Sequence, residues 1–104
     1  MRFNLETESE IKRKAKQWLD KNGWFSFNIH QQGLYCYKGI SDRIAIKSGR
    51  VVFIEFKTMS KKSKQSPDQI AFGQKVREAG GEYIVVRSKE DMVFQLTGER
   101  QLTI

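Results

Sequence analysis

The sixteen residues DRIAIKSGRVVFIEFK, numbers 42–57, decide the fold of this chain. Two runs rich in β-branched and other apolar residues flank Ser48-Gly49, a dipeptide that suits the two-residue turn of a β-hairpin. The run Val51–Ile54 is apolar on both faces, which is typical of a strand covered above and below. The segment therefore predicts two antiparallel strands, over residues 42–47 and 50–58, with the second in the interior of a sheet.

A two-residue turn also determines which residues of the hairpin face one another. Lys47 then lies opposite Arg50, and every further pair has residue numbers that add to 97, so Asp42 lies opposite Glu55. Like charges at such positions are destabilising, because their Cβ atoms are only about 4.5–5.5 Å apart. Lys57 follows on the same strand face, two residues after Glu55. One end of the hairpin is therefore expected to gather two acids and a lysine.

Opposed carboxylates stabilise one another only when a cation lies between them. A hard divalent metal with oxygen ligands would convert the repulsion into a binding site. A lysine beside it could orient a water molecule and stabilise charge on a phosphate. The alternative is a solvated strand end that holds one salt bridge, and a bulge or a longer turn in the hairpin would weaken the metal hypothesis.

The rest of the chain reads as alternating helices and strands whose ends are marked by caps and glycines. The predicted elements are a helix capped by Thr7 and ended by Asn22-Gly23, a half-buried strand at 24–30, a helix capped by Ser66 and ended by Gly80-Gly81, a strand at 83–87, and a helix capped by Ser88 that runs to about Leu96. This order is typical of a small α/β domain with a mixed sheet between helices. We expect residues 1–104 to form that one domain.

Both longer helices place a polar side chain at the start of a core-facing stripe. Glu8 and Gln69 each lie three residues before an apolar residue of the predicted buried face. Glu10 is better explained as the closing residue of a capping box, and a capping box with Ser66 is an equal alternative for Gln69. We take this placement only as supporting evidence for a site at the hairpin end.

Four segments of the chain resemble the VRR-NUC branch of the PD-(D/E)XK nucleases. They are GISD at 39–42, IEFK at 54–57, SPDQ at 66–69 and AGGEYIVVR at 79–87. The resemblance spans about residues 8–88, and it implies an αβββαβ core to which one short C-terminal helix is appended. Ser41 departs from the pattern, which usually has proline before the aspartate, but the change removes no catalytic group.

The resemblance also implies a role for each matching residue. The implied metal ligands are Asp42, Glu55, Glu8 and the backbone carbonyl of Phe56, with Glu10 as second choice for the helix acid. Lys57 would position the nucleophilic water or steady the phosphate, and Gln69 would lie next to the metal, which is Mg²⁺ or Mn²⁺. Family members of this minimal size resemble stand-alone viral or bacterial homodimers that cut branched DNA, including four-way (Holliday) junctions. Two symmetric cuts need two active sites, which suits a dimer.

The charge balance favours a nucleic-acid partner. Among 104 residues, 19 are Lys or Arg and 12 are Asp or Glu, which gives a net charge of +7. Lys61, Lys62 and Lys64 follow the motif lysine and, with Arg43, are the expected DNA contacts. A solvated, mobile loop is the alternative for the three lysines. A non-catalytic nucleic-acid-binding module is the rival function, although the aromatic-rich pattern of RRM domains is missing.

Composition sets several other classes aside. No apolar run approaches the roughly 20 residues that span a bilayer, and the first ten residues do not resemble a signal peptide. The single cysteine, Cys36, cannot form an internal disulfide, so we expect a reducing, cytoplasmic location. His30 lacks a paired ligand and is expected to be structural.

Overall fold

The central hairpin forms with the turn that the sequence predicts. The computed structural model describes residues 5–29 and 37–99, and in it β2 (Arg43–Lys47) leads through Ser48 and Gly49 into β3 (Arg50–Phe56). The turn residues have φ angles of +50° and +81°, the left-handed pair of a type I′ turn, which matches the twist of a hairpin. Every observed pair has residue numbers that add to 97, so the predicted register is confirmed.

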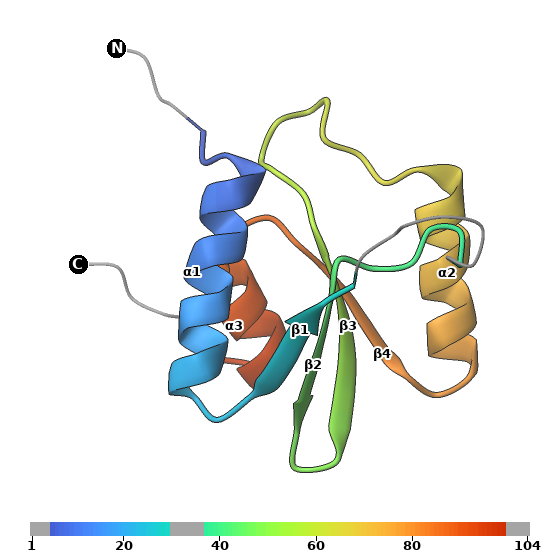
Figure 1. Cartoon of the computed structure of the whole chain (residues 1–104). Coiled ribbons are helices and arrows are strands. Elements are labelled where there is room, and N and C mark those ends of the chain that lie inside the picture. Colours follow the sequence, from blue (N-terminus) through green and yellow to red (C-terminus); the bar gives the residue numbers. More distant parts are fainter. Residues whose placement is uncertain (1–4, 30–36, 100–104) are drawn as a thin grey trace.

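The hairpin lies in the middle of a four-stranded mixed sheet (Figure 1). Strand β1 (Phe25–Asn28) pairs antiparallel with β2, and β4 (Glu82–Val86) pairs parallel with β3, which gives the order β1-β2-β3-β4. The helices are α1 (Glu8–Lys21), α2 (Pro67–Glu78) and α3 (Lys89–Thr97). Figure 1 shows α1 and α3 together on one side of the sheet and α2 on the other. The order of elements and the α/β class agree with the prediction.

Alternate residues of β3 point to opposite faces of the sheet, one covered by α1 and α3 and the other by α2. Ile54 and Phe56 are buried in the main core, which α1 and α3 complete. Phe53 points the other way, and its ring packs edge-on against Phe72 of α2, with 5.6 Å between ring centroids. Because side chains alternate along a strand, Glu55 lies on the same face as Phe53. One face of β3 therefore packs in the main core, and the other face presents Glu55 on the side of the sheet where α2 lies.

Strand β1 differs from its prediction in length and burial. It spans four residues, and Phe25 and Phe27 are 65% and 41% exposed, although the strand was expected to be half-buried. The two rings do share one face and lie 5.6 Å apart. Helix α2, however, packs on β4 at the opposite edge of the sheet, so none of the described helices lies above this part of the face.

Two sequence expectations lie outside the described residues, namely those for His30 and Cys36. None of the helices described is long and apolar enough to cross a membrane.

Candidate active site

Asp42 and Glu55 lie side by side at the end of the hairpin away from the turn. The Asp42 N–H donates to the carbonyl of Ile54 at 3.1 Å, and its carboxylate Oδ2 accepts from the Phe56 N–H at 2.8 Å. These contacts hold the Asp42 carboxylate against the end of β3, beside Glu55. The structure therefore brings together the two acids that the register predicts.

Glu55 is the most unusual charged group in the described part of the chain. It is only 2% exposed, and its Oε2 has no hydrogen-bond partner among the described residues. Burial, followed by the neighbouring Asp42 charge, raises the pKa of Glu55 from 4.5 to about 8. A buried carboxylate oxygen without a partner costs free energy, so its presence indicates a place where a cation or a donor is bound.

A lysine stands beside each of these acids. Lys57 Nζ lies 3.8 Å from Glu55 Oε1, and its side chain is only 14% exposed. Lys12, on α1, places its Nζ 3.8 Å from Asp42 Oδ1. The predicted pair of acids and one lysine is therefore accompanied by a second lysine, which comes from a different element.

Gln69 closes the capping box of α2 and also contacts the acid pair. Its Oε1 accepts from the Ser66 N–H at 2.9 Å, which closes the capping box of α2. Its Nε2 donates to Glu55 Oε1, also at 2.9 Å. The two roles are compatible because a side-chain amide has an acceptor at one end and donors at the other. The cap thereby orients the amide toward the buried acid.

Glu8 and Glu10 divide the roles that the sequence assigned to the start of α1. Glu10 closes the capping box with Thr7, whose N–H donates to Glu10 Oε1 at 3.2 Å. Glu8 instead pairs with Lys12, with 3.2 Å between Oε2 and Nζ. Lys12 therefore lies between Glu8 and Asp42, and Glu8 is linked to the Asp42–Glu55 pair through this lysine. Within residues 5–29 and 37–99, no cluster of three or more acidic, His or Cys side chains is arranged to hold a metal.

Comparison with known proteins bears on the fold. No protein-family model and no curated protein matches the sequence. A solved structure described as a VRR_NUC domain superposes on this chain with a TM-score of 0.70 and 20% identity, covering 86% of this chain and 96% of the other. The chain has the VRR-NUC fold. The fold that the sequence motifs implied is thereby confirmed, whereas the roles of individual residues depend on the geometry of this chain.

In this VRR-NUC fold, Gly39 lets the loop before Asp42 approach the first turn of α2. Its φ is +78°, and a Cβ added there would lie 2.1 Å from the Asp68 carbonyl oxygen and 2.6 Å from the Gln69 nitrogen. Only glycine accommodates both the left-handed φ and the contact with backbone. Gly39 thus sets the distance between the segment that carries Asp42 and the helix that carries Gln69.

We expect Gly39→Ala to lower the free energy of unfolding by about 3 kcal/mol or more, because strain and a backbone clash add. Gly80→Ala is the matched control, since Gly80 has a φ of +86° but open space around its missing Cβ. That variant should lose only about 1–2 kcal/mol from left-handed strain. Urea denaturation measures both, and equal losses would contradict the close approach.

The lysine-rich loop between β3 and α2 is tied to the rest of the fold. The Thr58 N–H donates to Ser63 Oγ at 2.9 Å, the Ser60 N–H donates to Thr58 Oγ1 at 3.2 Å, and the Arg87 guanidinium donates to the Thr58 carbonyl. The loop arches over the end of the sheet opposite the hairpin turn (Figure 1). Three side chains of this loop are exposed and cationic: Lys61, Lys62 and Lys64.

Arg43 does not take the place predicted for it at the surface. It is 5% exposed, and its guanidinium donates to Ser26 Oγ at 2.9 Å and to Asn28 Oδ1. Burial lowers the pKa of Arg43, although the nearby Asp20 charge opposes the shift. Its donors join β2 to the edge strand β1, so the expectation of a DNA contact at Arg43 is corrected to a structural role.

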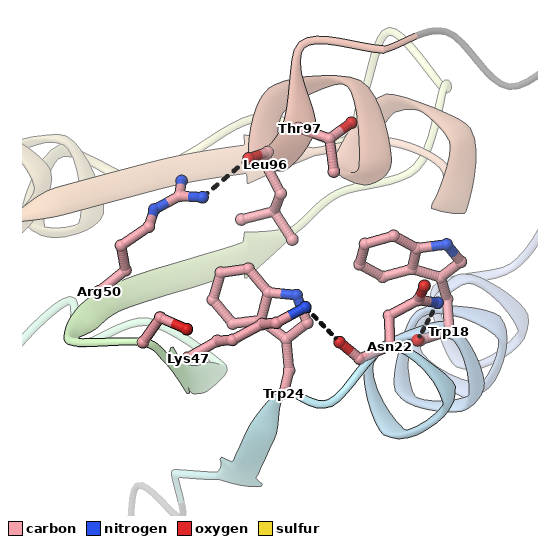
Figure 2. Close-up of a pocket in the computed structure, with 8 residues that line it drawn as sticks. Trp18, Asn22, Trp24, Lys47, Arg50, Leu96 and Thr97 are labelled. Atoms are coloured by element: carbon pink, nitrogen blue, oxygen red, sulfur yellow. Dashed lines mark hydrogen bonds between the residues drawn. The ribbon is translucent and has the colours of Figure 1, made fainter.

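A cavity of about 400 Å³ lies at the hairpin-turn end of the fold, away from the acids (Figure 2). Trp18 and Trp24 form part of its wall, and the cations that line it bind helix ends. Lys47 donates to the Asn22 carbonyl at 2.6 Å, and Arg50 donates to the Leu96 carbonyl at 2.9 Å. These contacts satisfy carbonyls at the C-termini of α1 and α3, which is a structural function.

Proposed function

We propose that this chain is an endonuclease that uses Mg²⁺ or Mn²⁺ to hydrolyse phosphodiester bonds in branched DNA, including four-way junctions. The observation that carries the proposal is the buried Glu55, which has one unpartnered oxygen and lies beside Asp42 and Lys57 on a VRR-NUC fold. A solvated strand end does not fit, because Glu55 is buried and packed against the Gln69 amide.

The donor set fits a hard divalent cation. Asp42 and Glu55 would hold it with their carboxylates, together with the backbone carbonyl of Phe56, and Glu8 would lie at the border. Oxygen donors in this number suit Mg²⁺, which usually keeps several waters and shares its remaining positions with substrate phosphate. A cation there would also give the unpartnered Glu55 oxygen a partner and offset the repulsion between the two acids. The chemistry of these donors therefore suits a divalent cation.

When bound, the metal would lower the pKa of a water molecule and neutralise charge on the phosphate. The chain supplies the orientation: Gln69 holds Glu55 by its Oε1, and the Phe56 N–H holds Asp42. Lys57 places a largely buried ammonium group next to Glu55, where charge is screened less than at the surface. We assign Lys57 to the stabilisation of charge that develops on the phosphate during hydrolysis.

The exposed lysines beside the site are proposed to follow the DNA backbone. Replacing Lys61 and Lys64 with glutamine should reduce the slope of log affinity against log salt concentration by about 0.9 for each phosphate that is no longer neutralised. Lys16→Gln on α1 is the control, since Lys16 pairs with Asp20 on an exposed helix face. Fluorescence anisotropy in EDTA at several salt concentrations gives the slopes. An unchanged slope would exclude these lysines from the footprint.

The proposal includes a homodimer, because paired cuts in a junction need two active sites. Phe25 and Phe27 of the edge strand β1, and Val51 of β3, are exposed on the same face of the sheet. Contiguous exposed apolar residues of this kind mark interaction surfaces. Sedimentation equilibrium distinguishes the dimer from a monomer, and a monomer at every concentration would remove this part of the proposal.

Incubation of the chain with linear and four-way-junction DNA tests the proposed activity. We expect cleavage of the junction in Mg²⁺ or Mn²⁺ and none in EDTA. The rival, a non-catalytic binding module, predicts a DNA complex and intact strands under every condition. Intact DNA in both metals would therefore reject the nuclease and leave the binding module.

A further inference from the structure

Lys12 makes a contact that its position on α1 does not require. A lysine and an acid four residues apart on a helix ordinarily form an exposed pair, as Lys16 and Asp20 do at 2.8 Å. Lys12 forms such a pair with Glu8 at 3.2 Å, and it also reaches Asp42 Oδ1 at 3.8 Å on a different element. Its ammonium group thus stands between two carboxylates.

The position of this ammonium group matters because Asp42 is one of the two carboxylates proposed to hold the metal. Each of those ligands has a lysine 3.8 Å away: Lys57 for Glu55 and Lys12 for Asp42. The two lysines differ in surroundings, since the Lys57 side chain is largely buried and that of Lys12 is more than a third exposed. Because its side chain is more exposed, Lys12 can move away from Asp42 more easily than Lys57 can move away from Glu55.

We propose that Lys12 is a built-in counter-ion that neutralises Asp42 when no metal is bound and competes with the divalent metal for it. The inference rests on the proposed function, because it needs a metal at Asp42 and Glu55. Lys12 is a positioning residue in this scheme. It sets metal affinity through the charge it places on Asp42, and its pair with Glu8 keeps it at the border of the site.

The competition is electrostatic, so its size and its salt dependence follow from the charges. A cation near Asp42 lowers the affinity for a second cation, and the interaction is only partly screened at a half-buried site. Removal of the Lys12 charge should therefore tighten binding of Mn²⁺ by about three- to tenfold at low salt. The gain should shrink as salt is added, because exposed charges are screened within about 10 Å at 0.1 M salt.

Isothermal titration of Mn²⁺ into the full chain, purified in EDTA and then dialysed, tests the inference without any cleavage assay. Lys12→Met removes the charge and keeps most of the stem, and Lys12→Gln is a second neutral variant in case the first folds poorly. Lys12→Arg keeps the charge and should bind Mn²⁺ as the wild type does. Lys16→Met, one turn further along α1, should also leave the affinity unchanged. Thermal unfolding followed by circular dichroism checks that all four variants are folded.

The outcomes separate this inference from the proposed function. The counter-ion is supported if Lys12→Met and Lys12→Gln bind Mn²⁺ more tightly than the wild type while Lys12→Arg and Lys16→Met do not. Measurable binding by the two neutral Lys12 variants also supports it when the wild type binds too weakly to measure. Equal or weaker binding by Lys12→Met and Lys12→Gln overturns the counter-ion. The metal site itself is still supported in that case if the wild type binds Mn²⁺ and Glu55→Gln fails to bind it. If no variant binds Mn²⁺ at all, the metal site and the counter-ion fail together.

Discussion

In the absence of divalent metal at pH 7.5, Glu55→Gln is expected to unfold at a higher temperature than the wild type. Burial and the neighbouring Asp42 charge raise the pKa of Glu55 to about 8, so the folded state disfavours the ionised carboxylate that water stabilises in the unfolded chain. A neutral amide of the same shape removes this penalty, which is on the order of a few kcal/mol near neutral pH. The melting temperature should rise by about 10 °C or more for a domain of this size.

Glu82→Gln is the matched control for this experiment. Glu82 accepts two hydrogen bonds from Arg50, at 3.0 and 2.7 Å, and these lower its pKa. Loss of that charge should leave the melting temperature unchanged or lower it, which is the opposite direction. Differential scanning calorimetry in EDTA gives both values. A Glu55→Gln variant that melts below the wild type would show that Glu55 does not carry the expected penalty.

The pH dependence of stability follows from the same shift. Folded Glu55 keeps its proton up to about pH 8, whereas the unfolded chain loses it near pH 4.5. Between these values the folded state binds more protons, so this group makes the free energy of unfolding fall as pH rises. Urea denaturation between pH 5 and 8 should show this loss in the wild type relative to Glu55→Gln. Parallel curves would contradict the raised pKa.

Lys57→Met should reduce the rate of DNA cleavage by about 10²–10³-fold, the usual cost of removing one group that stabilises developing charge. Lys57 is the largely buried lysine beside Glu55, so no exposed lysine of the neighbouring loop can replace it. We expect affinity for DNA in EDTA to stay within a few-fold of the wild type. Lys57→Arg should restore little, because a planar guanidinium does not reproduce a compact ammonium group.

Lys61→Met provides the comparison for this variant, since it removes an exposed lysine of the loop. It should weaken DNA binding while the single-turnover rate at saturating protein stays the same. A Lys57→Met variant that binds DNA less tightly but cleaves it at the normal rate would move Lys57 from the chemistry to the DNA footprint.

The features that the sequence predicted well are those set by local rules. A turn of two residues fixes a register, so the approach of Asp42 to Glu55 follows from Ser48-Gly49 alone. Capping boxes depend on residues three positions apart, and both form as predicted. The amide of Gln69 shows that two local interpretations can hold at once.

The features that we did not predict from the sequence depend on how the helices and strands pack on one another. The pattern of β1 puts Phe25 and Phe27 on one face, but the position of α2 over β4 decides that this face is exposed. Arg43 is a surface-type residue that is buried because the side-chain oxygens of Ser26 and Asn28, on the neighbouring strand, accept its donors. A long, flexible side chain such as Lys12 can reach another element in many ways, and sequence spacing does not select among them.

Cleavage of a four-way junction by the wild type and by Glu55→Gln, compared side by side in Mn²⁺, tests the central claim most directly. We predict that the wild type cuts the junction, that EDTA stops the reaction, and that Glu55→Gln is at least about 10²–10³-fold slower although it is folded and more stable. Equal cleavage by the two proteins would contradict the claim that Glu55 and its neighbours form the active site, and an intact junction with the wild type would contradict the nuclease itself.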